Sequence, residues 1–86
     1  MAEGEDKYID RAVLETVENQ LRDGTPPETR ATLERLMKEG YSREEAVRLI
    51  GRVVTAEIFG VLKEGEPSDE NRYVAALRRL PALPGE

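Results

Sequence analysis

The chain is 86 residues long, carries a formal net charge of −5, and contains neither cysteine nor histidine. This length fits a single domain, and the acidic balance argues against nucleic-acid binding, which needs clustered Lys and Arg. Without cysteine and histidine the chain lacks disulfides, thiol nucleophiles, the commonest metal ligands and the commonest general base. We therefore expect a cytoplasmic, non-enzymatic protein that uses no cofactor.

A membrane span is not expected either. The most apolar stretch, Val53 to Leu62, contains Glu57 and is far shorter than the about 20 residues that cross a bilayer. Abundant Glu and Arg, few Asn and Gln and the absence of Cys favour a thermophilic source, and a GC-rich genome would produce much of the same bias.

The first predicted helix covers Tyr8 to Asp23 and follows an acidic N-terminal tail, residues 1–7. Helical spacing predicts an inward face made of Ile9, Ala12, Val13, Val17, Gln20 and Leu21. Gly24 suits the left-handed residue that often ends a helix.

The second predicted helix covers Pro26 to Glu39. Thr25 is the expected N-cap, Pro26 the first helical residue, and Glu28 the reciprocal partner in a capping box. Its predicted inward residues are Leu33, Leu36 and Met37. Gly40 ends this helix, and a second capping box, Ser42 with Glu45, begins the next one.

The third predicted helix, Arg43 to Glu64, is the longest, at about 33 Å. One apolar stripe consists of Ala46, Leu49, Ile50, Val53 and Ala56. A second consists of Val47, Val54, Ile58, Val61 and Leu62, with Phe59 between the two. A helix that is apolar on two faces is either central in its bundle or buried against a second copy. Gly51 and Gly60 within it suggest a close helix crossing.

The fourth predicted helix covers Asp69 to Leu80, after Gly65 and a cap at Ser68 or Asp69. Its predicted inward residues are Tyr73, Val74, Leu77 and Leu80, and the Pro-rich tail of residues 81–86 is expected to be extended or disordered. The sequence thus predicts an all-α domain over residues 1–86, a single small bundle of about four helices with a long central third helix.

Four polar residues are candidates for a site. Gln20 and Glu57 interrupt apolar stripes, so each needs a partner if it is buried. An internal hydrogen bond or an edge position is the favoured interpretation, and the remnant of a polar site inside the bundle is the alternative. A carboxylate-only metal site would use Glu18, Glu45 and Glu57.

Four short segments follow one another along the chain: Val17-Glu18-Asn19-Gln20, Pro26-Pro27-Glu28, Gly40-Tyr41 and Glu45-Ala46. In their order and spacing the chain resembles a family of small bacterial all-helical domains of unassigned activity. Relatives of this kind have histidines where this chain has Leu14, Glu44 and Arg48. The resemblance thus implies metal-ligand spacing in the family that this chain has lost, and Glu44 with Arg48 is expected to form a surface ion pair instead.

The leading functional hypothesis is a protein-interaction or oligomerisation domain that forms a homodimer. This hypothesis is based on the second apolar stripe of the third predicted helix. Its residues form the candidate dimer surface: Val47, Val54, Ile58, Val61 and Leu62. The alternatives are a degenerate or carboxylate-only metal-binding domain, and a regulator that binds an unidentified protein partner.

Overall fold

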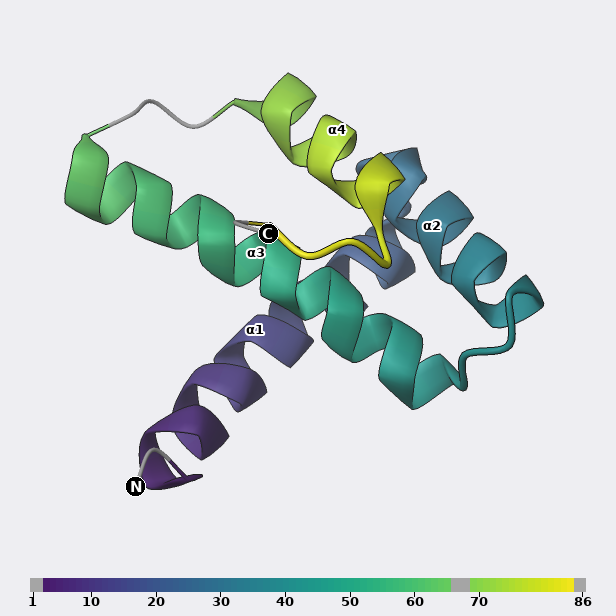
Figure 1. The fold of residues 1–86 in the computed structure, drawn as a ribbon, viewed down its shortest axis with the longest axis horizontal. Helices are drawn as coiled ribbons and strands as arrows, with labels where there is room; N and C mark the ends of the chain where they lie inside the picture. Colours follow the sequence, from purple (N-terminus) through teal and green to yellow (C-terminus); the bar gives the residue numbers. More distant parts are fainter. Residues whose placement is uncertain (1–2, 66–68, 85–86) are drawn as a thin grey trace.

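The computed structural model describes the backbone of residues 3–65 and 69–84 and the side chains of residues 11–62, 65 and 69–84. These residues form helices α1 (Glu3–Asp23), α2 (Pro27–Lys38), α3 (Arg43–Glu64) and α4 (Glu70–Arg79). Helix α3 is the longest and contacts the other three, crossing α1 on one side and packing against α2 and α4 on another (Figure 1). The predicted all-α bundle with a long central third helix is confirmed.

The ends of the helices follow the local sequence signals in most places. Gly65 ends α3 in the left-handed conformation, with φ of 68°. Ser42 and Glu45 form the predicted capping box, in which the Ser42 hydroxyl accepts from the Glu45 amide at 3.0 Å and the Glu45 carboxylate accepts from the Ser42 amide at 2.9 Å. Asp69 is the N-cap of α4 and accepts from the Asn71 amide at 3.0 Å; Ser68, the other proposed cap, lies outside the described residues.

The start of α2 differs from the prediction. Thr25 does not form a capping box with Glu28, because Pro26 is the N-cap and Pro27 begins the helix. Pro26 has φ −74° and ψ 152°, the extended conformation that a following proline imposes on the residue before it. The second proline therefore moves the start of the helix by one residue. The Thr25 hydroxyl instead donates to the Asp23 carbonyl at 3.5 Å.

The two predicted tails also differ from expectation. Helix α1 begins at Glu3, so residues 3–7 are helical and not part of a tail. At the other end, Leu83 packs against the core, so the segment after α4 covers part of the bundle.

The core consists mainly of residues predicted to face inward. The buried apolar residues are Val13, Val17, Leu21, Leu33, Leu36, Ala46, Val47, Ile50, Val53, Val54, Tyr73, Leu77 and Leu80. Two predicted inward residues, Ala12 and Met37, are exposed instead, as is Ala56 of the first apolar stripe of α3, and the side chain of Ile9 lies outside the described residues. Thr29 and Thr32 take buried positions on α2, because the side of this short helix that faces the bundle is wider than its apolar stripe.

Two arginines of α2 hold the C-terminal ends of the neighbouring helices. The last carbonyls of a helix have no partner within the helix. Arg30 donates to the Leu21 carbonyl of α1 at 2.6 Å. Arg35 donates to the carbonyls of Leu80 at 2.9 Å and Leu77 at 3.1 Å, at the end of α4. Helix α2 thus fixes α1 and α4 by charge-assisted bonds as well as by packing.

Helices α1 and α3 come closest at Gly51. A Cβ atom built at Gly51 would lie 2.9 Å from Cγ1 of Val13. The sequence prediction of a close crossing is therefore confirmed at Gly51. The helix that crosses there is α1 of the same chain, so Gly51 is not available to a crossing with a second copy.

We expect Gly51→Ala to lower the free energy of unfolding by about 1 kcal/mol. Overpacking costs about 1–3 kcal/mol, which exceeds the gain of up to about 1 kcal/mol in helix propensity, and the β-branched Val13 side chain has little rotamer freedom to yield. Urea denaturation measures the change.

The double variant Val13→Ala/Gly51→Ala is the control. Shortening Val13 makes room for the new methyl group, so the double variant should lose less stability than the sum of the two single changes. Strict additivity would show that the Gly51–Val13 contact is not the cause.

Candidate functional site

Gln20 lies at the junction of three helices. Its Oε1 accepts one hydrogen bond from the Thr29 hydroxyl of α2 and one from the Tyr73 hydroxyl of α4, both at 2.8 Å. The predicted internal hydrogen bonding of Gln20 is confirmed. Burial raises the pKa of the Tyr73 phenol, which keeps it protonated as a donor. Gln20 therefore joins α1 to α2 and α4 by a buried polar contact.

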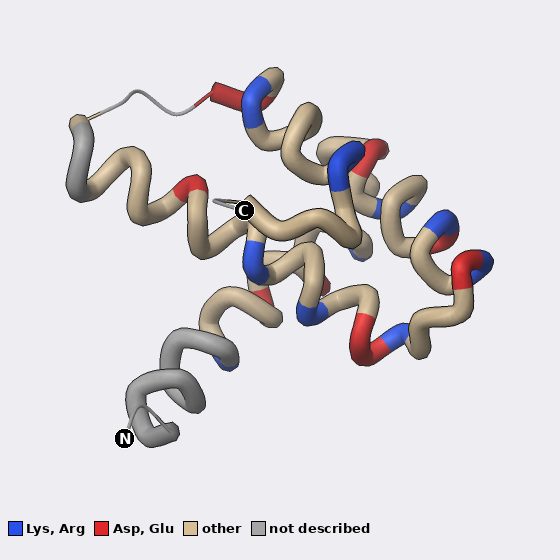
Figure 2. The backbone as a smooth tube through the Cα atoms, in the orientation of Figure 1, with Lys and Arg blue, Asp and Glu red and all other residues tan. Residues whose placement is uncertain are grey.

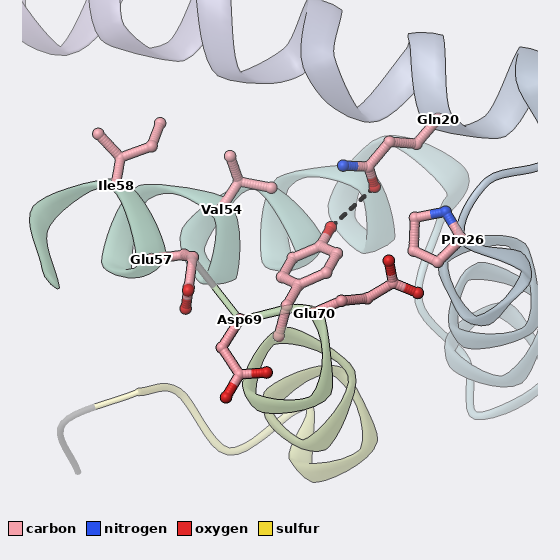
Figure 3. Close-up of a pocket in the computed structure, with 8 residues that line it drawn as sticks. Gln20, Pro26, Val54, Glu57, Ile58, Asp69 and Glu70 are labelled. Atoms are coloured by element: carbon pink, nitrogen blue, oxygen red, sulfur yellow. Dashed lines mark hydrogen bonds between the residues drawn. The ribbon is translucent and has the colours of Figure 1, made fainter. Parts of the chain in front are cut away.

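A pocket of about 250 Å³ lies beside this junction (Figure 3). It is lined by Gln20, Pro26, Val54, Glu57, Ile58, Asp69, Glu70 and Tyr73. Tyr73 and Gln20 are bonded to each other, and Asp69 caps α4. The described lining residues thus include no nucleophile paired with a base, and we assign no catalytic step to this pocket.

Glu57 stands at the rim of the pocket and faces α4. Its two carboxylate oxygens accept from Arg72, at 2.8 Å from Nη2 and 3.3 Å from Nε. The Glu57 side chain is 19% exposed, so the break in the apolar pattern is explained by a partly buried, bidentate ion pair that joins α3 to α4.

Glu18 and Glu45 do not meet Glu57. Glu18 forms a bidentate pair with Arg43 at 2.9 and 3.1 Å, and these hydrogen bonds lower the pKa of Glu18. Glu45 is occupied in the capping box at the start of α3, about 18 Å along the helix from Glu57 at 1.5 Å per residue. Among the residues that the structure describes, no group of three or more acidic side chains is placed to hold a metal ion.

Glu44 and Arg48, two of the three positions singled out by the resemblance, form an ion pair, as predicted. Arg48 Nε lies 3.7 Å from Glu44 Oε2, and both side chains are exposed. Such pairs contribute little to stability. Leu14, the third position, is half-buried against the core.

The candidate dimer surface divides into two parts. Val47 and Val54 are buried inside the chain's own bundle and are not available to a partner, which corrects that part of the prediction. Both belong to the hydrophobic core that α3 shares with the other helices. Farther along α3, Ile58 is 46% exposed, Phe59 52% and Leu62 75%, and Val61 is half-buried. We call Ile58, Phe59 and Leu62 the α3 stripe.

The α3 stripe lies where α3 extends past the bundle, at the end of the helix remote from α2 (Figure 1). From Val54 to Leu62 the only charged residue is Glu57 (Figure 2), and its charge is paired with Arg72. Phe59, which was placed between the stripes and left out of the candidate surface, is part of it. The uncharged run from Ile58 to Leu62 is the sequence feature that could have placed Phe59 in the candidate surface.

Comparison with protein-family models, with curated proteins and with solved structures finds no match. No helix in residues 3–65 and 69–84 is both long enough and apolar enough to cross a membrane. The candidate site is therefore described from the structure alone: it is the exposed apolar end of α3, next to the buried core.

Proposed function

We propose that this chain is a non-enzymatic protein-interaction domain that forms a homodimer through the α3 stripe. The observation that carries the proposal is the exposure of three large apolar side chains on two consecutive turns of one helix. Large contiguous apolar patches on a protein surface usually mark interaction sites.

The rest of the described surface supports this choice of site. Among the described residues, one other large apolar side chain is exposed, that of Met37 on α2, at 45%. No other large apolar side chain of α2 is exposed. Isolated apolar residues are normal on surfaces. The α3 stripe is different because its members adjoin one another and lie next to an uncharged length of helix.

The size of the stripe sets the expected affinity. Stable interfaces bury about 800 Å² on each partner, and three side chains supply only part of that area. Burial contributes about 25 cal/mol per Å², against a large entropic cost of association. We therefore expect a reversible dimer with a dissociation constant in the micromolar range or weaker.

Sedimentation equilibrium tests the proposal. The mass of the wild-type chain should rise with concentration from 9.7 kDa towards twice that value. Leu62→Asp should raise the dissociation constant at least about tenfold, because it places a charge in the apolar contact.

Met37→Asp is the matched control, since it introduces the same charge at an exposed apolar residue outside the stripe, and it should leave the association unchanged. A wild-type chain that stays monomeric at about 1 mM would overturn the proposal. So would equal effects of the two substitutions.

A further inference from the structure

The stripe belongs to a longer exposed line on α3 whose spacing is symmetric. Arg52, Thr55, Phe59 and Leu62 follow one another at intervals of three, four and three residues, so they lie along one side of the helix. Arg52, Phe59 and Leu62 are exposed and Thr55 is half-buried, while Ile58 flanks the line. An interval pattern of this kind reads the same in both directions.

This symmetry favours one orientation for a second copy. If two α3 helices pair antiparallel about residue 57, each Phe59 lies opposite Thr55 of the other copy, and each Leu62 lies opposite Arg52. A two-fold dimer needs such a self-complementary surface. In a parallel pairing, Arg52 would face Arg52, and the negative ends of both helix dipoles would lie together.

Arg52 has a chemical reason to lie opposite Leu62. Leu62 is in the last turn of α3, where the final carbonyls lack partners within the helix. Arg52 makes no hydrogen bond or ion pair with any described residue, since the bonds that the structure records for arginines involve others. A cation at a helix C-terminus is stabilising.

The same contact occurs twice inside the chain. Arg30 binds a carbonyl at the end of α1, and Arg35 binds two at the end of α4. Resting on the proposed function, we infer that α3 pairs antiparallel with α3 of a second copy, and that Arg52 of each copy binds the C-terminal carbonyls of the other copy's α3. The C-terminal ends of α1, α3 and α4 would then each be held by an arginine.

The first test compares dissociation constants by sedimentation equilibrium. Arg52→Ala removes the contact from both copies and should weaken the dimer about three- to thirtyfold, the size expected for two cations at helix C-termini, and the difference should shrink in high salt. Arg78→Ala, which removes an exposed arginine on α4, should leave the dissociation constant unchanged. An unchanged constant for Arg52→Ala would overturn the inference.

The second test fixes the orientation, and it uses the absence of native cysteine. Oxidation of a mixture of Arg52→Cys and Leu62→Cys chains, at a concentration where both dimerise, should give mainly the mixed disulfide. Antiparallel pairing separates the two Leu62 positions by about 15 Å along the helix, beyond the about 7 Å that a disulfide spans between Cα atoms.

A preference for Leu62–Leu62 disulfides would show parallel pairing and overturn the inference, while the homodimer itself would stand. A wild-type chain without any dimer would instead overturn the proposed function. The two failures are thus distinguished by the sedimentation data on the wild-type chain.

Discussion

Ile50→Ala should lower the free energy of unfolding by about 2–5 kcal/mol, the range for truncating a large aliphatic side chain in a core. Ile50 is fully buried on α3, the helix that contacts all three others. The substitution loses the transfer free energy of the removed carbons and leaves a cavity that four mutually packed helices cannot easily close. Domains are stabilised by only about 5–15 kcal/mol in total, so this change should remove a large part of the stability.

Ile58→Ala is the matched control, because it makes the same substitution two turns later on the same helix. Ile58 is 46% exposed, so its truncation should cost less than about 1 kcal/mol in the monomer. Urea denaturation followed by circular dichroism, at a protein concentration below the dissociation constant, measures both variants. Equal losses would mean that Ile58 is as well packed as Ile50, which would contradict the exposed stripe.

Helix content and most helix boundaries could be predicted because they depend on local chemistry. Glycine after a helix and the Ser42–Glu45 box act within a few residues, and they fix both ends of α3 at the predicted positions. The box predicted at Thr25 is wrong because two adjacent prolines compete for the first helical position. A proline disfavours the helical conformation in the residue before it, so Pro26 is extended and the helix begins at Pro27.

The division of α3 into a buried and an exposed half could not be predicted. Both apolar stripes run the length of the helix in the sequence, and nothing local indicates how far α1 covers them. The packing of the other helices against α3 settles this. Val54 is buried beside Gln20 of α1 and Tyr73 of α4, whereas Ile58, one turn later, remains exposed.

The partners of polar residues that pair between different helices could not be predicted from the sequence either. Glu18 lies four residues before Arg22, the spacing of an ion pair within one helix, yet it pairs with Arg43, 25 positions away. The need of Gln20 and Glu57 for partners could be inferred from their place in apolar stripes, but the identities of Thr29, Tyr73 and Arg72 depend on helix packing. A pattern in the sequence shows that a buried polar group must be satisfied, and only the fold shows by which residue.

The Gln20 junction gives the second large expected effect. Gln20→Leu should lower the free energy of unfolding by about 2–4 kcal/mol, because it leaves two buried hydroxyl groups without an acceptor, at about 1–3 kcal/mol each. Thr29 is fully buried and Tyr73 nearly so, which limits the access of water to either hydroxyl. Thermal and urea unfolding of the single variant measure the loss.

The triple variant Gln20→Leu/Thr29→Val/Tyr73→Phe separates the missing acceptor from the change of shape. It removes both donors together with the acceptor, and replacing all the partners of a buried hydrogen bond by apolar groups of similar shape can be nearly neutral. We therefore expect the triple variant to be more stable than Gln20→Leu alone, although it carries two further substitutions. If each added substitution lowers the stability further, the cost of Gln20→Leu comes from packing, and the shared acceptor is not what joins α1 to α2 and α4.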